Sequence, residues 1–168
     1  FYCSDRSKEI RPVKPLLIKG KEVQSLIDLY AILLTCGWRE NSRSATKSVP
    51  EWNEDAPWEY QSAPTALLVQ QYFGGDICSR VCLNRTHYFN EIDGVVIDLT
   101  FLEIFQMANT SPYDSAKIKN LGRPKQTMRN NVVLLNHLLC NCGIDDRVCA
   151  PTTKRNKRPA PKRRSGAR

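Results

Sequence analysis

Long apolar runs are absent from this sequence, because no stretch approaches the roughly 18 residues that a membrane-spanning helix needs. We therefore expect no membrane partner. Internal repeats are absent too, so a repeat architecture is not expected. What is present is a chain of 168 residues, of which 41% are hydrophobic and 25% charged. This length and composition are typical of one globular domain with its own core.

Acidic residues are missing from the C-terminal end. Residues 151–168 contain eight lysines or arginines and no Asp or Glu, while the whole chain has a net charge of +8. The tail therefore carries the entire excess of positive charge, and residues 1–150 are close to neutral by formal count. Because the tail also has prolines and almost no apolar side chains, we expect disorder from residue 150 onward.

The cysteines do not form an even set, since the chain has seven. A chain of this length folds without disulfides, so we interpret them as mostly reduced thiols of an intracellular protein. Two stretches, 84–86 and 109–111, fit the glycosylation acceptor pattern and keep a secreted alternative open.

Four soft-ligand side chains gather near the end of the domain: His137, Cys140, Cys142 and Cys149. Four such ligands are enough for a zinc ion, but their spacing is not that of a usual structural zinc site. Buried thiols on a helix explain the cluster equally well. We therefore expect no metal and no cofactor.

Hydrophobic periodicity predicts three main helices, in which apolar residues recur every three or four positions. They cover residues 21–35, 62–73 and 125–139. Strands are predicted over 76–83, 86–90 and 95–99, and Asp93-Gly94 between the last two is a strong hairpin signal. A short turn or helix is expected over 101–107, and loops over 39–57 and 109–123.

This order favours an α+β fold in which a helix packs on a small antiparallel sheet, followed by a C-terminal helix and a basic tail. We expect an N-terminal segment over 1–20, one domain over 21–149 and the disordered tail over 150–168.

Ser62 stands at the start of the best-marked helix, with an early proline after it and Gly74-Gly75 at the end. A helix start has unpaired N–H groups and a partial positive charge, which stabilise a thiolate or an oxyanion. A cysteine at this position is a nucleophile near neutral pH, whereas a serine needs a strong base beside it.

The hairpin supplies His87 as a candidate base. With a two-residue turn, His87 and Asp98 are diagonal neighbours about 7–8 Å apart on one face. A four-residue loop puts them directly opposite, and a three-residue loop puts them on opposite faces. Ser62, His87 and Asp98 thus form a candidate triad. Each also has a structural alternative: a helix cap, an ordinary strand side chain and a turn cap, respectively.

The stretch from Gln61 to Gly75 resembles the helix of the YunG family, in which Gln-Cys precedes Thr-Ala, an apolar helix and Phe-Gly-Gly. Residues 87–90 resemble the family's His-Tyr-Trp-Asn, and residues 93–100 resemble its Asp-Gly and Val-Asp-Leu-Thr. The resemblance covers roughly residues 22–140, with clear motifs in 58–105. It implies a papain-like fold with catalytic Cys, His and Asp at positions 62, 87 and 98.

Ser62 departs from this pattern, because the family has cysteine there; the basic tail is a second departure. We interpret Ser62 as an engineered replacement that silences the nucleophile, with a natural variant as the alternative. With cysteine at position 62, His87 would take the thiol proton and Asp98 would fix the tautomer of the ring. The candidates for an oxyanion donor and for cleft residues are Gln61, Asn90 and Trp58.

The resemblance therefore implies a thiol-dependent amidohydrolase, peptidase, deamidase or acyltransferase acting on a protein or peptide amide, inactive with Ser62. The alternatives are a pseudoenzyme that binds a peptide or a modified side chain, and a nucleic-acid-associated protein that uses the domain as a scaffold. The tail is similar to a nuclear localisation signal or a nucleic-acid arm. Nucleic acid or an import receptor is thus an expected partner, in a nucleus or in a host cell that receives the protein.

Deleting residues 151–168 tests the role of the tail. Because phosphate contacts by the tail release counterions, the full chain should bind duplex DNA with an affinity that falls steeply as salt rises. The truncated chain should lose this binding, as measured by fluorescence anisotropy at several salt concentrations. Binding that survives the truncation contradicts our interpretation of the tail.

Overall fold

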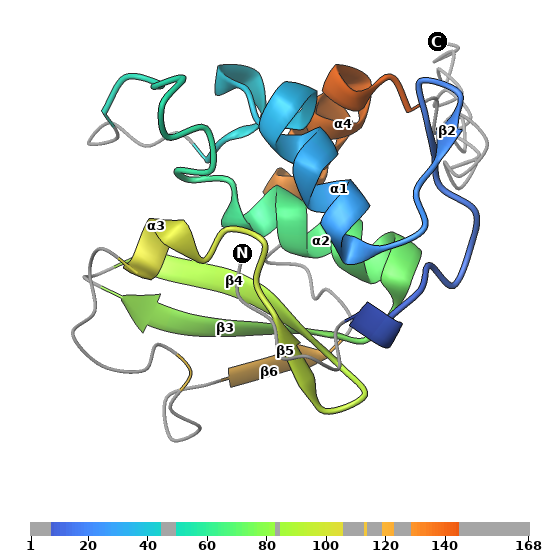
Figure 1. Cartoon of the computed structure of the whole chain (residues 1–168). Coiled ribbons are helices and arrows are strands. Elements are labelled where there is room, and N and C mark those ends of the chain that lie inside the picture. Colours follow the sequence, from blue (N-terminus) through green and yellow to red (C-terminus); the bar gives the residue numbers. More distant parts are fainter. Residues whose placement is uncertain are drawn as a thin grey trace, which may run out of the picture.

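The structure, a computed structural model, describes residues 8–44, 50–82, 85–105, 113, 119–122 and 129–144. The elements in chain order are β1 (Leu17–Ile18), β2 (Lys21–Glu22), α1 (Leu26–Ile32), a π-helix η2 (Leu33–Gly37), a 3-10 turn η3 (Glu40–Ser42), α2 (Ser62–Phe73), β3 (Asp76–Cys82), β4 (Arg85–Ile92), β5 (Val95–Ile97), α3 (Leu102–Phe105), β6 (Lys119–Gly122) and α4 (Arg129–Cys142) (Figure 1). The expected α+β class is confirmed.

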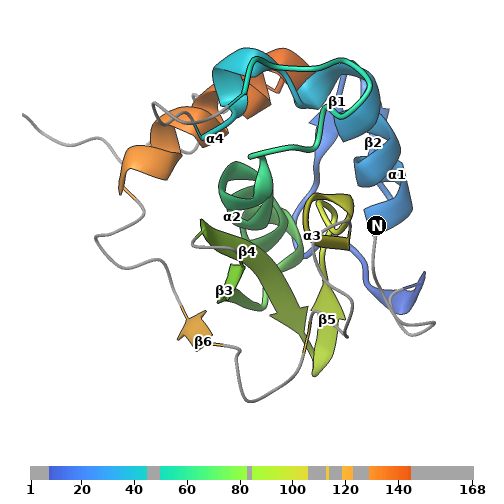
Figure 2. The ribbon, with the colours of Figure 1, turned by 90° about the vertical axis from the view of Figure 1, so that its left-hand side faces the viewer.

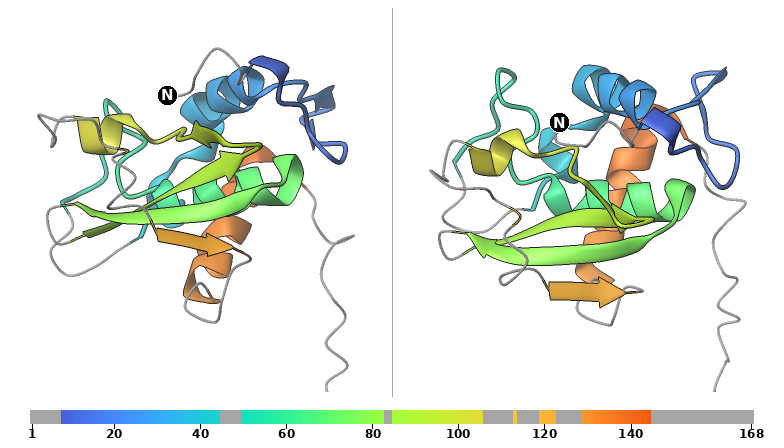
Figure 3. Two further views of the ribbon diagram at one scale, coloured as in Figure 1. Left: turned by 90° about the horizontal axis from the view of Figure 1, so that it is seen from below. Right: turned by 60° about the horizontal axis from the view of Figure 1, so that its bottom comes forward.

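The main sheet has four antiparallel strands in the order β5-β4-β3-β6. Figure 3 shows β6 at the edge of the sheet, beside β3. Strands β4 and β5 join through a two-residue turn, since Ile92 pairs with Val95. Asp93 and Gly94 have φ angles of 51° and 74° in this turn. These left-handed angles explain why an Asp-Gly pair marks the hairpin.

Helix α2 lies between the sheet on one side and α1 and α4 on the other, as Figures 1 and 2 show. It contacts β4 and β3 on one side and α4 on the other. Nearly all of its residues are buried, including both Ser62 at its start and Phe73 at its end. A helix that is apolar around most of its circumference belongs inside a core. The start of this helix is therefore held in place by its surroundings on several sides.

Within the predicted N-terminal segment, the described residues 8–20 pack against the rest of the domain. Leu16 and Ile18 are buried in the same core as α1 and α2. The N–H of Val13 donates a hydrogen bond of 2.7 Å to the carbonyl of Tyr72, near the end of α2. The sequence pattern missed this because two short apolar stretches around prolines carry no clear period.

Three element boundaries differ from the sequence prediction. The first helix begins at Leu26 and not at residue 21, because residues 21–22 pair with β1 and Ser25 caps the helix by accepting from Asp28 N–H. Strand β6 lies inside the stretch predicted as loop. The N-cap of α2 is Gln61, and Ser62 is the first helical residue, so its predicted capping role is wrong.

Several predictions lie outside the described residues, among them the disorder of residues 150–168 and the placement of Cys149. Of the part of the chain that the structure describes, no helix combines the length and the apolar character that crossing a bilayer requires.

The substitution Gly75→Ala tests the close approach between the turn that joins α2 to β3 and the backbone of β4. Gly75 has a φ of 74°, and a Cβ atom there would collide with the carbonyl oxygen of Glu91. Gly20 has a similar φ of 77° but open space around it, so Gly20→Ala is a matched control. Gly20→Ala should cost about 1 kcal/mol of unfolding free energy from backbone strain, and Gly75→Ala clearly more, about 2–3 kcal/mol. Urea unfolding measures both; equal losses contradict the predicted close approach.

Candidate functional site

The β4–β5 hairpin brings His87 and Asp98 together. The two-residue turn gives the register in which these residues are diagonal neighbours on one face. Their side chains are joined by a hydrogen bond of 2.7 Å between His87 Nε2 and Asp98 Oδ2. Both are almost fully buried, with 3% and 1% of their side-chain surface exposed. The structure thus pairs two of the three residues that the sequence analysis selected.

Asp98 is held by three further donors. Its Oδ1 accepts hydrogen bonds from the backbone N–H of Thr100 at 2.8 Å and from the Thr100 hydroxyl at 3.0 Å. Its Oδ2 accepts a second hydrogen bond, from the hydroxyl of Tyr113 at 2.6 Å. Burial alone would raise the pKa of Asp98, but the charge of His87 and these hydrogen bonds lower it. Asp98 is therefore an ionised, fixed acceptor for the imidazole ring.

The second nitrogen of His87 has a different environment. Its Nδ1 lies 3.5 Å from Glu103 Oε2, on α3. Within the described part of the chain, both atoms are buried without a hydrogen-bond partner. Burial would lower the pKa of His87, but the negative charges of Asp98 and then of Glu103 outweigh this effect and raise it from 6.5 to about 10. These charges favour the imidazolium form of His87, with one N–H hydrogen-bonded to Asp98 and the other in a longer ion-pair contact with Glu103.

Ser62 lies on the element next to this pair. Helix α2 packs against β4, and Asn90 on β4 fixes the contact by donating from Nδ2 to the carbonyl oxygen of Ala66, at 3.0 Å. Figure 1 shows the first turn of α2 above the part of β4 that adjoins α3. Ser62 is 5% exposed. No hydrogen bond joins it to His87, since the Nδ1 atom has no partner among the described residues. The structure therefore pairs His87 with Asp98 but does not link Ser62 to them.

The three remaining candidates have structural contacts. Gln61 is fully buried; its Nε2 donates to the carbonyl of Arg39 at 2.8 Å, and its Oε1 accepts from the Ser42 hydroxyl at 3.0 Å. Gln61 thus ties the η3 turn to the start of α2. Asn90 is committed to α2, and Trp58 packs against the core. The donors left for an oxyanion are the backbone N–H groups of the first turn of α2.

Two residues of this site were not found from the sequence: Glu103 and Tyr113. Glu103 lies five positions after Asp98, where a turn toward α3 brings it back to His87; an acidic residue in a predicted short helix gave no reason to choose it. Tyr113 lies 15 positions after Asp98 in the sequence, and its ring also packs edge-on against Phe89, with ring centres 5.2 Å apart. Only the three-dimensional structure shows either contact.

The cysteine-rich end does not form a metal site within the described residues. No group of three or more His, Cys, Asp or Glu side chains there converges on one point. Cys142 is fully buried, whereas Cys140 and His137 are exposed on the same helix. Five cysteines of the described ranges are free thiols: Cys36, Cys78, Cys82, Cys140 and Cys142.

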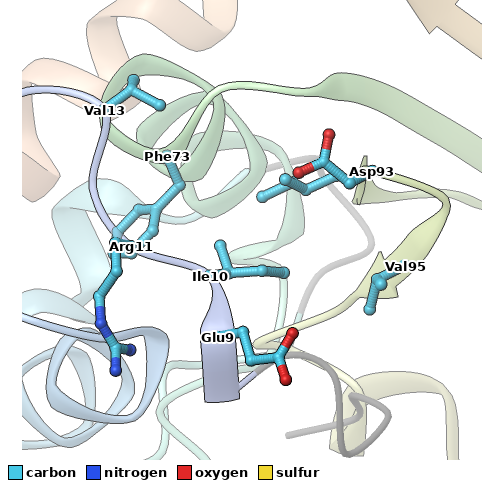
Figure 4. Close-up of a pocket in the computed structure, with 8 residues that line it drawn as sticks. Glu9, Ile10, Arg11, Val13, Phe73, Asp93 and Val95 are labelled. Carbon is cyan, nitrogen blue, oxygen red and sulfur yellow. The ribbon is translucent and has the colours of Figure 1, made fainter.

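A surface pocket of about 330 Å³ lies away from the candidate triad. It is formed by the N-terminal segment, the last residue of α2 and the β4–β5 turn, and Figure 4 shows Ile10, Phe73 and Val95 around it. None of Ser62, His87 or Asp98 lines it. The pocket therefore has no part in the chemistry considered for these residues.

Comparisons with known proteins give one family. The family model described as YunG protein matches residues 25–141. "Uncharacterized protein YunG" of Bacillus subtilis (strain 168) is 35% identical over 68 residues, which are 40% of this chain and 54% of that protein. The chain therefore spans about half the length of this curated relative. No solved structure matches the chain.

The raised pKa of His87 gives a direct prediction. The imidazole should titrate near pH 10, as measured by NMR. Asp98→Asn should lower this pKa strongly, because it removes the main negative charge that stabilises the protonated ring. The chain has two histidines. The signal that remains in the His137→Gln variant therefore belongs to His87.

The same shift predicts a pH dependence of stability. Because the pKa of His87 is higher in the folded state, its contribution to stability is complete below about pH 6.5, declines above it, and is lost as the pH rises through about 10. Urea midpoints of the parent should fall over this window more than those of His87→Gln. An imidazole that titrates near pH 6.5 contradicts the described pair.

Proposed function

The chain belongs to the YunG family, and on this premise we propose that the site is that of a thiol-dependent amide hydrolase or acyl-transfer enzyme. In this proposal position 62 carries the nucleophile, His87 is the acid and base, and Asp98 orients the ring. The substrate is an amide of a protein or peptide. The chain with Ser62 is the silent form of this enzyme.

The observation that carries the proposal is the unequal environment of the two ring nitrogens of His87. Its Nε2 is fixed by Asp98 at 2.7 Å, while its Nδ1 is buried and has no hydrogen-bond partner among the described residues. Its contact with Glu103 is an ion pair of 3.5 Å, and a buried N–H without a hydrogen bond costs free energy that a new acceptor would recover. A structural histidine would satisfy both nitrogens. A catalytic one keeps the second nitrogen for the nucleophile and the substrate.

The pKa of His87 favours a thiol over an alcohol as that nucleophile. A general base for serine has to be neutral before it takes the hydroxyl proton, and an imidazole with a pKa of about 10 is almost entirely protonated at pH 7. A thiol is much more acidic, so a thiolate forms readily beside an imidazolium and a helix start. The site therefore supports cysteine chemistry and leaves a serine in the same place without an effective base.

The reaction follows from these roles. The thiolate would attack the carbonyl carbon of the amide, forming a carbon–sulfur bond and an oxyanion that faces the N–H groups at the start of α2. His87 would give its Nδ1 proton to the leaving nitrogen as the carbon–nitrogen bond breaks. Water or another amine would then release the acyl group. Hydrolysis, deamidation and transfer differ only in the leaving and accepting groups.

The same arrangement supports a papain-like fold as part of the proposal. A buried helix carries the nucleophile position at its start, and the following antiparallel strands carry the histidine and the acid. The pseudoenzyme and the scaffold that binds nucleic acid through residues 151–168 remain the competing proposals. The first predicts no reactive thiol at position 62, and the second predicts that the tail alone decides function.

The substitution Ser62→Cys tests the proposal. The new thiol should react with iodoacetamide far faster than Cys82, a half-buried native cysteine that serves as internal reference. Its reaction should persist at pH 6, because a thiolate next to an imidazolium has a pKa well below the usual value of about 8.5. Peptide mapping by mass spectrometry after timed labelling measures both rates.

The double variant Ser62→Cys, His87→Gln is the control. It should lose the fast reaction at pH 6 while keeping the fold, as checked by circular dichroism. If the thiol at position 62 reacts no faster than Cys82 in a folded protein, or reacts equally fast without His87, the enzyme proposal is wrong.

A further inference from the structure

Arg80 is a buried arginine on β3 with two guanidinium nitrogens that make no hydrogen bond in the described part of the chain. Its side chain on β3 is 9% exposed. In the described part of the chain, its Nε and Nη1 atoms are buried and make no hydrogen bond. Buried guanidinium N–H groups that make no hydrogen bond raise the free energy of the folded protein. A ligand with an anionic oxygen group would satisfy these donors.

Its position relates Arg80 to the candidate site. Arg80 and His87 are direct partners in the antiparallel β3–β4 pair. Side chains of directly opposite residues lie on the same face of a sheet, with Cβ atoms about 4.5–5.5 Å apart. The aliphatic part of the Arg80 side chain therefore projects from the sheet on the same face as the imidazole of His87, next to it. The two nearby carboxylates, Asp98 and Glu103, face His87 instead.

Another arginine of similar burial makes the contrast clear. Arg43 is 7% exposed, and its Nη2 donates a hydrogen bond of 2.6 Å to the carbonyl of Pro50. Its charge and donors are thus used by the protein itself. Arg43 behaves as a structural arginine, whereas Arg80 offers unused donors next to a catalytic candidate.

We propose that Arg80 is a substrate-binding residue that takes an anionic oxygen group, a carboxylate or a phosphate. The planar fork of a guanidinium matches two oxygens of such a group in a bidentate pair. This inference rests on the proposed function, because the anionic group belongs to the substrate whose amide faces His87. Arg80 then sets specificity: the enzyme takes amides that carry a negative charge close to the bond that is cleaved.

The chain with Ser62 is suited to the test, because binding is measured without turnover. Arg80→Met removes an unpaired buried charge and keeps the length of the stem, so it should raise the melting temperature of the free protein. Arg43→Met removes a charge whose donor is used, so it should lower the melting temperature. The opposite signs separate a binding arginine from a structural one.

Ligand binding gives the second readout. The probes are inorganic phosphate, N-acetylglycine and the uncharged amide of N-acetylglycine, each titrated by calorimetry and by thermal unfolding. Phosphate, N-acetylglycine or both should bind to the parent and to Arg43→Met, and the uncharged amide should not. Binding to Arg80→Met should be weaker by about tenfold or more, the usual loss for a hydrogen-bonded charge pair. If only one of the two anionic probes binds, that result identifies whether the site takes a phosphate or a carboxylate.

The inference is overturned if Arg80→Met melts below the parent, or if it binds the anions as well as the parent does. Absence of anion binding in the parent overturns it too. These outcomes are independent of the labelling of the thiol in Ser62→Cys, which depends on His87 and not on Arg80. A reactive thiol without anion binding thus rejects the role of Arg80 and leaves the proposed function intact.

Discussion

The buried hydrogen bond between His87 Nε2 and Asp98 Oδ2 is the interaction on which the site depends. Two ionised groups out of water are stable only when each is well paired, and Asp98 satisfies this condition through His87, Thr100 and Tyr113. The hairpin register brings His87 to this carboxylate, and Thr100 and Tyr113 donate hydrogen bonds to it. Because Asp98 takes the Nε2 atom of His87, Nδ1 is the nitrogen that is left without a hydrogen bond among the described residues.

The carboxylates around His87 determine its protonation state. Asp98 and Glu103 favour the cationic ring and raise its pKa to about 10, which in the proposed enzyme stabilises a thiolate better than it deprotonates an alcohol. In the proposed enzyme, the side-chain atom at position 62 decides the activity. A sulfur forms a thiolate that the helix start and the imidazolium stabilise, whereas the oxygen of serine stays protonated. In the proposed enzyme, Arg80 on the neighbouring strand adds a positive charge that binds the substrate.

Much of this arrangement was predictable because it is local in the sequence. The Asp93-Gly94 pair determined the turn, the turn determined the register, and the register put His87 and Asp98 on one face. The apolar pattern of residues 62–73 gave the buried helix. The predicted cap at Ser62 was wrong, since Gln61 takes that position and bonds to the η3 turn. Glu103, Tyr113 and the unpaired Arg80 depend on contacts across the fold, for which a periodicity argument has no signal. Strand β6 was missed for the same reason, because its pairing with β3 and not its own composition makes it a strand.

The most direct test of this account is a crystal structure of the Ser62→Cys variant. The central claim is that the free nitrogen of His87 serves position 62. It predicts that the new sulfur lies within roughly 3–4 Å of His87 Nδ1, a distance that permits proton transfer, while Asp98 stays on Nε2. A sulfur that points away into the core, out of hydrogen-bonding reach of Nδ1, would contradict the claim.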